Sequence, residues 1–593
     1  MVRAAQPGAG RRMLKHLVRT LLRGAGGGEA DSDASAQAER LQVCIVSAAE
    51  HAAAGDHAAA ARFYQQCVEL QPQNARLWCN YGAELHETGR KSEAELAYAH
   101  ALELDSALAQ AWYNLGQLQQ ERGDESEAER SYRSALALPR EAHDQEMWRL
   151  AHNNLGLLLQ NQGRLQDAVQ LYRAALETEP ADAGLRSNLL FVLTAMADAD
   201  ADAVLREHRE WGRLHRGAFA AHANAPDPER RMRIGYVSAD FYGHPLAFHL
   251  LPLLAQRDRA RTEVMLYSNG TKQDAMTARL RQAADGWRDI GRLGDAEAEA
   301  LVRADGIDLL VDLSGHTAGN RLPLFARKPA PLQLTMLGYA NTTGLDCMDY
   351  RITDRYADPP GSEARYVEQL LRMPHSLWCY EPQRATPPAH PPPLHANGYV
   401  TFASFNAAYK LNHALIQVWA EILRAVPGSR LMLVNVPAGA ARERILGWLA
   451  RAGIGSDRLE LHPRLPTEEF WAAHRRADIA LDPFPCNGGA TTCETLWLGV
   501  PVLTLAGRNF VGRAGVSLLS NCGLAQLIAG SPEEYVALAA GLARDPERLA
   551  QLRLELRQSL PASPLFDGRA YAQALEAHYR RIWRQWCSGR GHA

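Results

Sequence analysis

The stretch from Asp478 to Pro501, "DIALDPFPCNGGATTCETLWLGVP", decides how the second half of the chain is interpreted. Its apolar start, Ile479 to Leu481, predicts a short strand, and residues from about Ala490 onward predict a helix. A strand, a flexible turn and a helix start form a phosphate-binding arrangement, because backbone N–H groups and the positive helix end face the anion. Glu494, in the first helical turn, is placed to accept hydrogen bonds from a ribose diol. The alternative is an ordinary turn with threonine as the helix N-cap.

Composition excludes several classes of protein. The 593-residue chain is long enough for roughly three or four domains, and its apolar fraction of 47% is typical of a soluble globular protein. The net charge of −3 indicates no nucleic-acid partner. Nine cysteines without a Cys-x-x-Cys pair indicate reduced thiols in the cytoplasm, with neither a disulfide framework nor a zinc site. No apolar run approaches the ~18 residues of a membrane span.

The first 40 residues contain a basic segment followed by a glycine-rich run. Arg11, Arg12, Lys15 and Arg19 alternate with leucines, which is also the pattern of an amphipathic helix on a membrane surface. The segment has no signal-peptide core or cleavage site. We therefore interpret residues 1–40 as a flexible, solvated arm.

A repeat of 34 residues follows the arm. Gly55, Gly89 and Gly123 keep this spacing, and the same holds for Ala60, Ala94 and Ala128 and for Tyr64, Tyr98 and Tyr132. Small residues where paired helices cross, with large residues between them, are typical of tetratricopeptide repeats. The sequence predicts an α-helical superhelix over residues 41–228.

One polar position recurs within the repeats and predicts a protein-binding surface. It is occupied by Asn80, Asn114, Asn154 and Asn188. Stacked repeats would align these amides so that they bond the backbone of an extended peptide; the alternative is that they only cap or pack the repeat. The segment "ADADADA", residues 197–203, is interpreted as a solvated loop, because a metal-binding aspartate pair is expected at a strand end.

From Arg231 onward, strands and helices alternate in two series, separated by "ATPPAHPPP" at residues 385–393. Two such series predict two doubly wound, Rossmann-like domains, residues 229–394 and 395–593, the second with a closing C-terminal helix. Ligands bind such sheets at the carboxyl ends of strands, here in the cleft between the domains. His244, His316 and Lys410 follow predicted strands, where a histidine is a candidate base and a lysine can neutralise a diphosphate. Structural roles for the same side chains are the alternative.

Several motifs in this part carry a family resemblance. They are "GYVSADFYGHPLAFHL", "FARKPAPLQLTMLGYANTTG", "DYRITD", "FNAAYKLN", "VWAEILRAVPGSRL" and "CNGGATTCETLWLGVPVLTLAG". Together, and in this order after a repeat region, they resemble the protein O-GlcNAc transferase and SPINDLY family, over Gly55 to about Trp586. The resemblance implies a glycosyltransferase-B fold and inverting, metal-independent transfer from a nucleotide sugar to Ser or Thr of proteins, without a further cofactor.

The resemblance also implies roles for individual residues. His244 matches the active-site histidine of a His-Pro motif, Lys410 the diphosphate-contacting lysine, and Leu337 and Gly338 the backbone that contacts the donor sugar. Glu494 matches an acidic residue on the ribose. The remaining expected donor-binding positions are His316, Tyr339, Asn406, Leu465, Phe470, Pro485, Asn487, Gly488, Gly489, Ala490, Thr491 and Thr492.

Departures from the animal O-GlcNAc transferases concern the donor. The animal enzymes have Gln at the position of Ala407, His-Thr at Gly489-Ala490, Asp at Glu494 and His at Phe470. His316 and "ANTTG" are more similar to SPINDLY, whose plant members transfer fucose from GDP-fucose. We expect UDP-GlcNAc as donor, with GDP-fucose as the alternative. A peptide-binding superhelix fused to a silent nucleotide-binding module, and transfer to a small molecule or glycan, are the other hypotheses.

Overall fold

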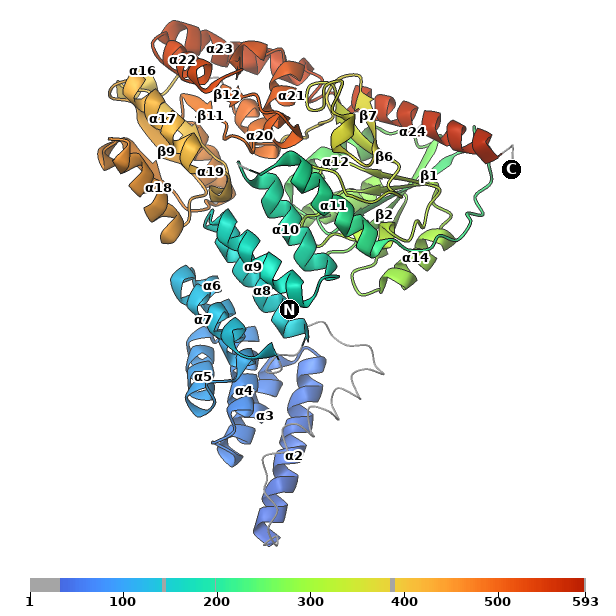
Figure 1. Cartoon of the computed structure of the whole chain (residues 1–593), viewed down its shortest axis with the longest axis vertical. Coiled ribbons are helices and arrows are strands. Elements are labelled where there is room, and N and C mark those ends of the chain that lie inside the picture. Colours follow the sequence, from blue (N-terminus) through green and yellow to red (C-terminus); the bar gives the residue numbers. More distant parts are fainter. Residues whose placement is uncertain (1–31, 141–144, 198, 384–389, 591–593) are drawn as a thin grey trace. The chain divides into compact units, whose positions relative to one another are not determined.

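The computed structural model describes residues 32–140, 145–197, 199–383 and 390–590 (Figure 1). They divide into two compact units, with the division between Leu158 and Leu159. The predicted boundary at residue 228 therefore differs from the observed one, because the last repeat helices pack with the α/β part. The basic N-terminal segment, up to residue 31, and most of the predicted proline-rich link, residues 384–389, lie outside the described residues. The first described helix begins at Ser32, within the predicted arm.

The first unit consists of helices paired as the repeat pattern predicts. They are α2 (Ser32–Ala53), α3 (His57–Leu70), α4 (Ala75–Glu87), α5 (Lys91–Leu104), α6 (Ala109–Arg122), α7 (Glu125–Ala137) and the start of α8 (Gln145–Asn161). A Cβ atom on Gly82 would lie 2.7 Å from the ring of Tyr98, so only glycine permits this helix crossing. Gly55, Gly89 and Gly123 have φ angles of +82°, +79° and +85° and form the turns that end helices.

The second unit begins with the last repeat helices: the end of α8, then α9 (Leu165–Thr178), α10 (Ala183–Ala195) and α11 (Ala201–His215). The Asp200 carboxylate accepts hydrogen bonds from the backbone N–H groups of Asp202 and Ala203 and caps α11. The segment 197–203 is therefore only partly the loop that we predicted; its second half is helical.

Two parallel sheets follow. The first has the order β3-β2-β1-β4-β5-β6-β7 and the second the order β10-β9-β8-β11-β12-β13. The first contains β1 (Met232–Ser238), β2 (Thr262–Ser268), β3 (Gly286–Asp289), β4 (Leu309–Asp312), β5 (Leu332–Thr335), β6 (Tyr350–Asp354) and β7 (Gln369–Met373). The second contains β8 (Thr401–Ser404), β9 (Arg430–Leu433), β10 (Leu459–Leu461), β11 (Ile479–Leu481), β12 (Val502–Leu505) and β13 (Ile528–Ala529). The predicted pair of Rossmann-like halves is confirmed, whereas β3, β7 and β13 were not predicted.

Helices connect the strands of each half. In the first half these are α12 (Pro245–Gln256), α13 (Ala275–Ala283), α14 (Asp295–Ala304), α15 (Leu322–Phe325) and the short turn Glu363–Arg365. In the second half they are α16 (Leu394–Asn397), α17 (His413–Ala425), α18 (Ala440–Arg451), α19 (Thr467–His474), α20 (Ala490–Trp497), α21 (Ala514–Asn521), α22 (Pro532–Ala543) and α23 (Pro546–Ser559). Further 3₁₀ turns span Ala408–Lys410, Ser456–Arg458, Phe510–Gly512, Ala525–Leu527 and Leu560–Ala562.

The strand orders show where each sheet changes direction. In the first sheet the order reverses between β1 and β4, and in the second between β8 and β11. Sheets of this kind bind their ligands at the carboxyl ends of the strands between which the order reverses. His244 follows β1, Lys410 follows β8, and the turn formed by residues 482–489 follows β11.

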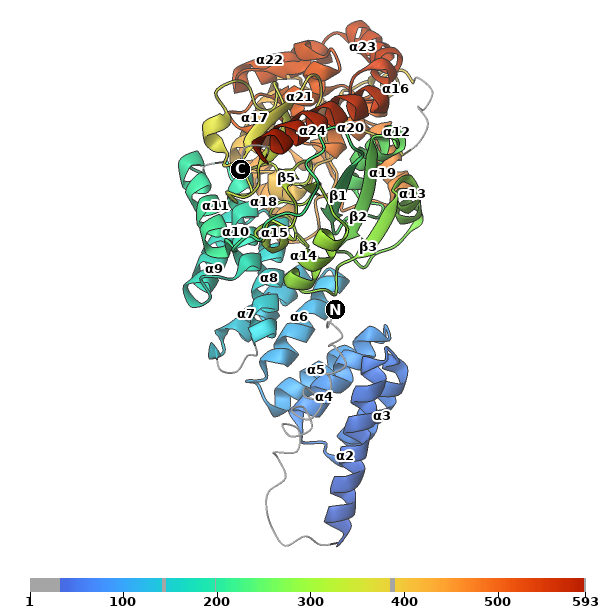
Figure 2. The ribbon, with the colours of Figure 1, turned by 90° about the vertical axis from the view of Figure 1, so that its right-hand side faces the viewer.

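The C-terminal helix α24 (Gly568–Arg590) belongs to the core of the first half. Its residues Tyr571, Leu575, Tyr579 and Trp583 are buried together with residues of β1, β2 and β4. Figure 2 shows this helix, in dark red, returning across the first sheet. The predicted second domain therefore ends before α24, which closes the first half instead.

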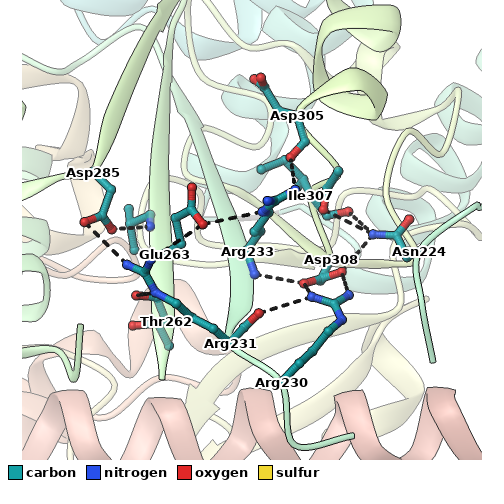
Figure 3. Close-up of polar contacts among 12 residues, drawn as sticks. Asn224, Arg230, Arg231, Arg233, Thr262, Glu263, Asp285, Asp305, Ile307 and Asp308 are labelled. Atoms are coloured by element: carbon teal, nitrogen blue, oxygen red, sulfur yellow. Dashed lines mark hydrogen bonds and ion pairs between the residues drawn. The ribbon is translucent and has the colours of Figure 1, made fainter. Parts of the chain in front are cut away.

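A network of ion pairs and hydrogen bonds lies at the amino ends of the strands of the first sheet (Figure 3). Asp308, which is fully buried, accepts hydrogen bonds from Arg230, from Asn224 at 2.7 Å and from the backbone N–H of Arg233 at 2.8 Å. Arg580 on α24 donates to the carbonyl oxygen of Arg230 at 2.8 Å. This edge lies opposite the carboxyl ends of the strands and therefore stabilises the fold away from the site.

Candidate active site

The turn between β11 and α20 is clamped by a buried carboxylate. Asp482 accepts hydrogen bonds from the backbone N–H of Gly488 and from the Thr504 hydroxyl, each at 2.7 Å. Burial raises the pKa of Asp482 to about 6. A Cβ atom on Gly488 would lie 2.4 Å from the Thr492 hydroxyl oxygen, so this turn leaves no room for a side chain at residue 488. The turn therefore has a fixed shape before any ligand binds.

Lys410 reaches the same turn from the end of β8. Its ammonium group donates to the carbonyl oxygen of Asn487 at 2.6 Å. Burial by itself lowers the pKa of Lys410, but the negative potential of Cys486, Tyr409 and Asp482 outweighs burial, so the net shift is upward. The side chain is thus a cation held beside the turn and the N-terminus of α20.

Amide groups fix the rest of this turn. The Asn487 side chain donates to the carbonyl oxygen of Pro483 at 2.9 Å, and Asn412 donates to that of Phe484 at 2.7 Å. Asn406 is buried beside Gly488. Gly489 is the N-cap of α20 without a side-chain cap, and Ala490 and Thr491 remain partly exposed, whereas Thr492 is buried. Pro485 is also partly exposed. The partly exposed backbone at residues 489–491 is where an anion can meet the helix end.

His244 lies at the carboxyl end of β1, as the N-cap of α12. Its Nδ1 atom accepts the backbone N–H of Leu246 at 3.3 Å and lies 3.7 Å from a carboxylate oxygen of Asp240. Burial lowers the pKa of His244, and the Asp240 charge opposes this shift. The ring is therefore neutral near pH 7, the state that a general base needs, and with Nδ1 as the acceptor in this structure Nδ1 is the atom that can take up a proton. Its side chain is 38% exposed, so a substrate can reach it.

The turn after β5 contains the two expected sugar-contacting positions. Leu337 has a φ of +65°, which is uncommon for a residue with a side chain. A Cβ atom on Gly338 would lie 2.0 Å from the carbonyl oxygen of Leu313, so glycine is required there. Gly338 is exposed, and Leu337 packs against the hydrophobic cores of both halves. The structure thus places this turn at the junction of the two halves.

Glu494 occupies a different environment from the one that we expected. It is 4% exposed, and its two carboxylate oxygens accept hydrogen bonds from the Tyr380 hydroxyl and, at 2.7 Å, from the Trp471 indole N–H. In this structure the carboxylate is therefore satisfied within the protein and is not open to a ribose. Tyr380 precedes the second half in sequence and Trp471 lies on α19, so the Glu494 carboxylate links the segment around Tyr380 to α19.

His316 and Tyr339 were also expected to bind the donor, but both side chains are buried. His316 accepts the Ser187 hydroxyl at Nδ1 (2.9 Å) and donates from Nε2 to the carbonyl oxygen of Thr343 (2.8 Å). Burial lowers the pKa of His316 well below its ordinary value. The Tyr339 hydroxyl contacts α10 and α11. Both side chains join the last repeat helices to the first sheet.

Phe470 and Leu465 remain candidates for nucleobase contact. Both are partly exposed and pack against the core of the second half. The Phe470 ring meets Phe405 and His474 edge to face, with centroids 5.7 and 4.7 Å apart. Such an aromatic group offers a stacking surface that does not distinguish one base from another.

The recurring asparagines are tied to neighbouring helices. The Asn154 amide donates to the hydroxyls of Tyr113 and Tyr132 at 3.3 and 3.5 Å. Asn80 and Asn188 hydrogen bond to Tyr64 and Tyr172 in the same manner, whereas Asn114 bonds to Gln110 and to the thiol of Cys79. The sequence did not predict these particular contacts. They support the alternative that the asparagines pack the repeat, because part of each amide is already hydrogen-bonded within the protein. Peptide binding stays a prediction.

The family model of glycosyl transferase family 41 matches residues 195–385 and 394–575, which together make up more than half of the chain. The chain belongs to glycosyl transferase family 41. Tetratricopeptide repeat models match residues 41–74, 63–95, 109–141 and 149–182. This order of repeats and catalytic region agrees with the observed helices and sheets.

Relatives of this family-41 chain are named as transferases. A Petunia hybrida protein named as a probable UDP-N-acetylglucosamine–peptide N-acetylglucosaminyltransferase SPINDLY is 40% identical over 70% of this chain and 46% of its own. An Arabidopsis thaliana protein with the same enzyme name, SEC, is 32% identical over 61% of this chain and 38% of its own. The chain thus spans less than half the length of these curated relatives. A mutant of Thermobaculum terrenum O-GlcNAc transferase matches with 33% identity and a TM-score of 0.73, over 93% of this chain and 99% of that one.

No helix in the described ranges is long and apolar enough to cross a membrane.

Proposed function

We propose that the chain transfers N-acetylglucosamine from UDP-GlcNAc to Ser or Thr hydroxyls of proteins, with inversion at the anomeric carbon. The relatives named as UDP-N-acetylglucosamine–peptide transferases support this donor. The observation that carries the proposal is the Lys410 ammonium held at 2.6 Å from the Asn487 carbonyl oxygen, beside the N-terminus of α20. A diphosphate at this place meets a cation, backbone N–H groups and a helix dipole without needing a metal ion or other cofactor.

In the proposed reaction, the acceptor hydroxyl oxygen forms a bond to the anomeric carbon, and the bond from that carbon to the diphosphate breaks. The hydroxyl proton goes to a base, for which neutral His244 is the candidate. The electron pair of the broken bond stays on the UDP leaving group, where Lys410 and the amides of residues 489–491 offset the new charge. Gly338 and Leu337 contact the sugar, and Phe470 stacks on the base. The repeat helices hold the acceptor protein.

The nine cysteines are all free and buried, which supports the predicted reducing, cytoplasmic location.

Calorimetric titration with UDP and GDP tests the donor, with Lys410→Ala as the variant. Losing a charge-assisted contact to a diphosphate costs about 1.5–3 kcal/mol, so we expect roughly 10- to 150-fold weaker UDP binding. Lys91→Ala is the matched control, because it removes an exposed lysine that pairs with Glu121 in the first unit. Preference for GDP would replace UDP-GlcNAc by GDP-fucose as donor. UDP binding without any transfer to peptide would favour the alternative of a catalytically silent nucleotide-binding module. Binding of neither nucleotide would refute the proposal that the chain is a glycosyltransferase.

A further inference from the structure

The turn that is proposed to contact the donor sugar is anchored on the side away from the ligand. Leu337 and Gly338 are followed directly by Tyr339, whose side chain is 3% exposed. The Tyr339 hydroxyl lies 2.9 Å from the Thr194 hydroxyl and 2.9 Å from Nε2 of His208. Thr194 belongs to α10 and His208 to α11, the last helix pair of the repeat region. The side chain after the sugar-contacting turn thus ends in the repeat helices.

The acceptors in this cluster limit where its protons lie. His208 lies with Nδ1 2.7 Å from the carbonyl oxygen of Val204, which can only accept, so Nδ1 carries the proton. Burial lowers the pKa of His208 to about 4, so the ring is neutral and its Nε2 is an acceptor for the Tyr339 hydroxyl proton; the carbonyl oxygen of Leu190 on α10, 3.1 Å from the hydroxyl, is a second acceptor for the same proton. The Thr194 hydroxyl then donates to Tyr339, and the Asn341 amide donates to Thr194 at 3.2 Å. Each hydrogen bond orients the next one.

The loop that continues from Tyr339 to Gly344 also packs closely against the backbone of α11. A Cβ atom on Gly212 would lie 1.8 Å from the carbonyl oxygen of Gly344. Arg351 fixes the other side, because its guanidinium donates to the carbonyl oxygens of Tyr339 at 2.9 Å and Asn341 at 2.7 Å. Its charge lies 4.7 Å from the ring centre of Phe510 in the second half. The turn is therefore held by the repeat helices, the first sheet and the second half together.

We infer that Tyr339 is a positioning residue: its hydroxyl fixes the Leu337–Gly338 turn against α10 and α11, so that binding of the donor sugar depends on the last repeat. The inference rests on the proposed function. A turn with a strained Leu337 relaxes when its anchor is lost, and a displaced backbone no longer meets the sugar. The diphosphate site at Lys410 lies on the second half and does not use this anchor. Loss of the hydroxyl is therefore expected to weaken binding of the sugar but not binding of UDP.

Tyr339→Phe in the full chain tests the inference by titration with UDP and by donor and peptide KM values. We expect the donor KM to rise about 5- to 10-fold, as for a buried hydrogen bond whose partner is left unsatisfied, while UDP affinity and peptide KM stay unchanged. Thr194→Val, which removes the other hydroxyl with little change of shape, gives the same split in a second variant. Tyr236→Phe is the control, because its buried hydroxyl contacts Tyr579 on α24 at 3.3 Å and thus belongs to a different pair of elements.

The outcomes separate this inference from the proposed function. A wild-type chain that binds no UDP refutes the proposed function itself. If UDP binds but the donor KM of Tyr339→Phe stays within twofold of wild type, Tyr339 is only structural. Equal weakening of UDP and donor in the variant also overturns the inference, because it reports general loss of folding.

Discussion

Asp482→Asn separates the stability of the turn from its function. In the folded chain burial raises the pKa of Asp482 to about 6, against an ordinary value of 3.8. The folded chain therefore binds the proton more tightly than the unfolded chain. The stability that this gives is fully present below pH 3.8 and is lost as the pH rises through 6. The pKa difference corresponds to about 3 kcal/mol of folding free energy, and this contribution is absent from the wild-type chain at neutral pH.

Asparagine carries no charge at any of these pH values, so the variant lacks this pH dependence. Its side-chain oxygen still accepts the Gly488 N–H, and its NH₂ group can donate to the Thr504 hydroxyl. We expect Asp482→Asn to melt at least as high as wild type at pH 7.5 and lower than wild type at pH 4.5. UDP affinity at pH 7.5 falls about tenfold, because the turn loses a charge-assisted hydrogen bond of roughly 1.5 kcal/mol.

Thermal melts at the two pH values and calorimetry with UDP measure both effects. Asp312→Asn is the matched control: burial raises the pKa of Asp312 to about 6 as well, and its carboxylate accepts the Thr335 hydroxyl at 2.8 Å on the first sheet. It should show the same change of melting temperature with pH and bind UDP like wild type. A melting difference between Asp482→Asn and wild type that is the same at both pH values would contradict the reasoning.

Two further predictions concern stability. His249 and His474 are buried, and burial lowers their pKa values to about 4 and about 3. At these two sites the folded chain therefore binds fewer protons than the unfolded chain. The stability that the neutral rings give the folded chain is present above pH 6.5, the ordinary pKa, and is lost as the pH falls toward 4. We expect this loss, about 3 kcal/mol for His249, to disappear in His249→Gln, measured as the change of melting temperature between pH 7 and 4.5. Asp308→Asn breaks the buried ion pair with Arg230 and should lower the free energy of unfolding by about 2–4 kcal/mol, measured by thermal or urea unfolding. This value is lower than that for a fully buried pair, because the Arg230 side chain is 24% exposed. Glu121→Gln, which breaks an exposed pair with Lys91, is its control and should change stability by no more than about 0.5 kcal/mol.

The sequence predicted the elements that local patterns determine. The strand Ile479–Leu481 and the start of α20 lie where the alternation of apolar and turn residues indicated, and the 34-residue glycine spacing located the repeat turns. It did not predict that α24 packs on the first sheet, because an amphipathic pattern does not say which core a helix joins. Tyr380 and Trp471, which bind Glu494, are 114 and 23 residues distant from it in sequence. Contacts of such separation leave no periodic signal, so the burial of Glu494 could not be seen.

The two halves use the same clamp for different purposes. β4 and β11 hold equivalent places in their sheets, and each has a buried aspartate at its carboxyl end that binds a threonine on the next strand: Asp312, the last residue of β4, with Thr335, and Asp482, directly after β11, with Thr504. After the neighbouring strands β1 and β8, the first half presents His244 and the second half Lys410. One position thus offers a neutral nitrogen and its counterpart a cation, which are the two groups that transfer from a diphosphate sugar to a hydroxyl requires. The clamps fix the turns after β4 and β11 in the same way, so the difference in chemistry between the halves comes from the side chains after β1 and β8. Replacing neutral His244 by a cation, or Lys410 by a neutral side chain, should abolish the proposed transfer while leaving the fold intact.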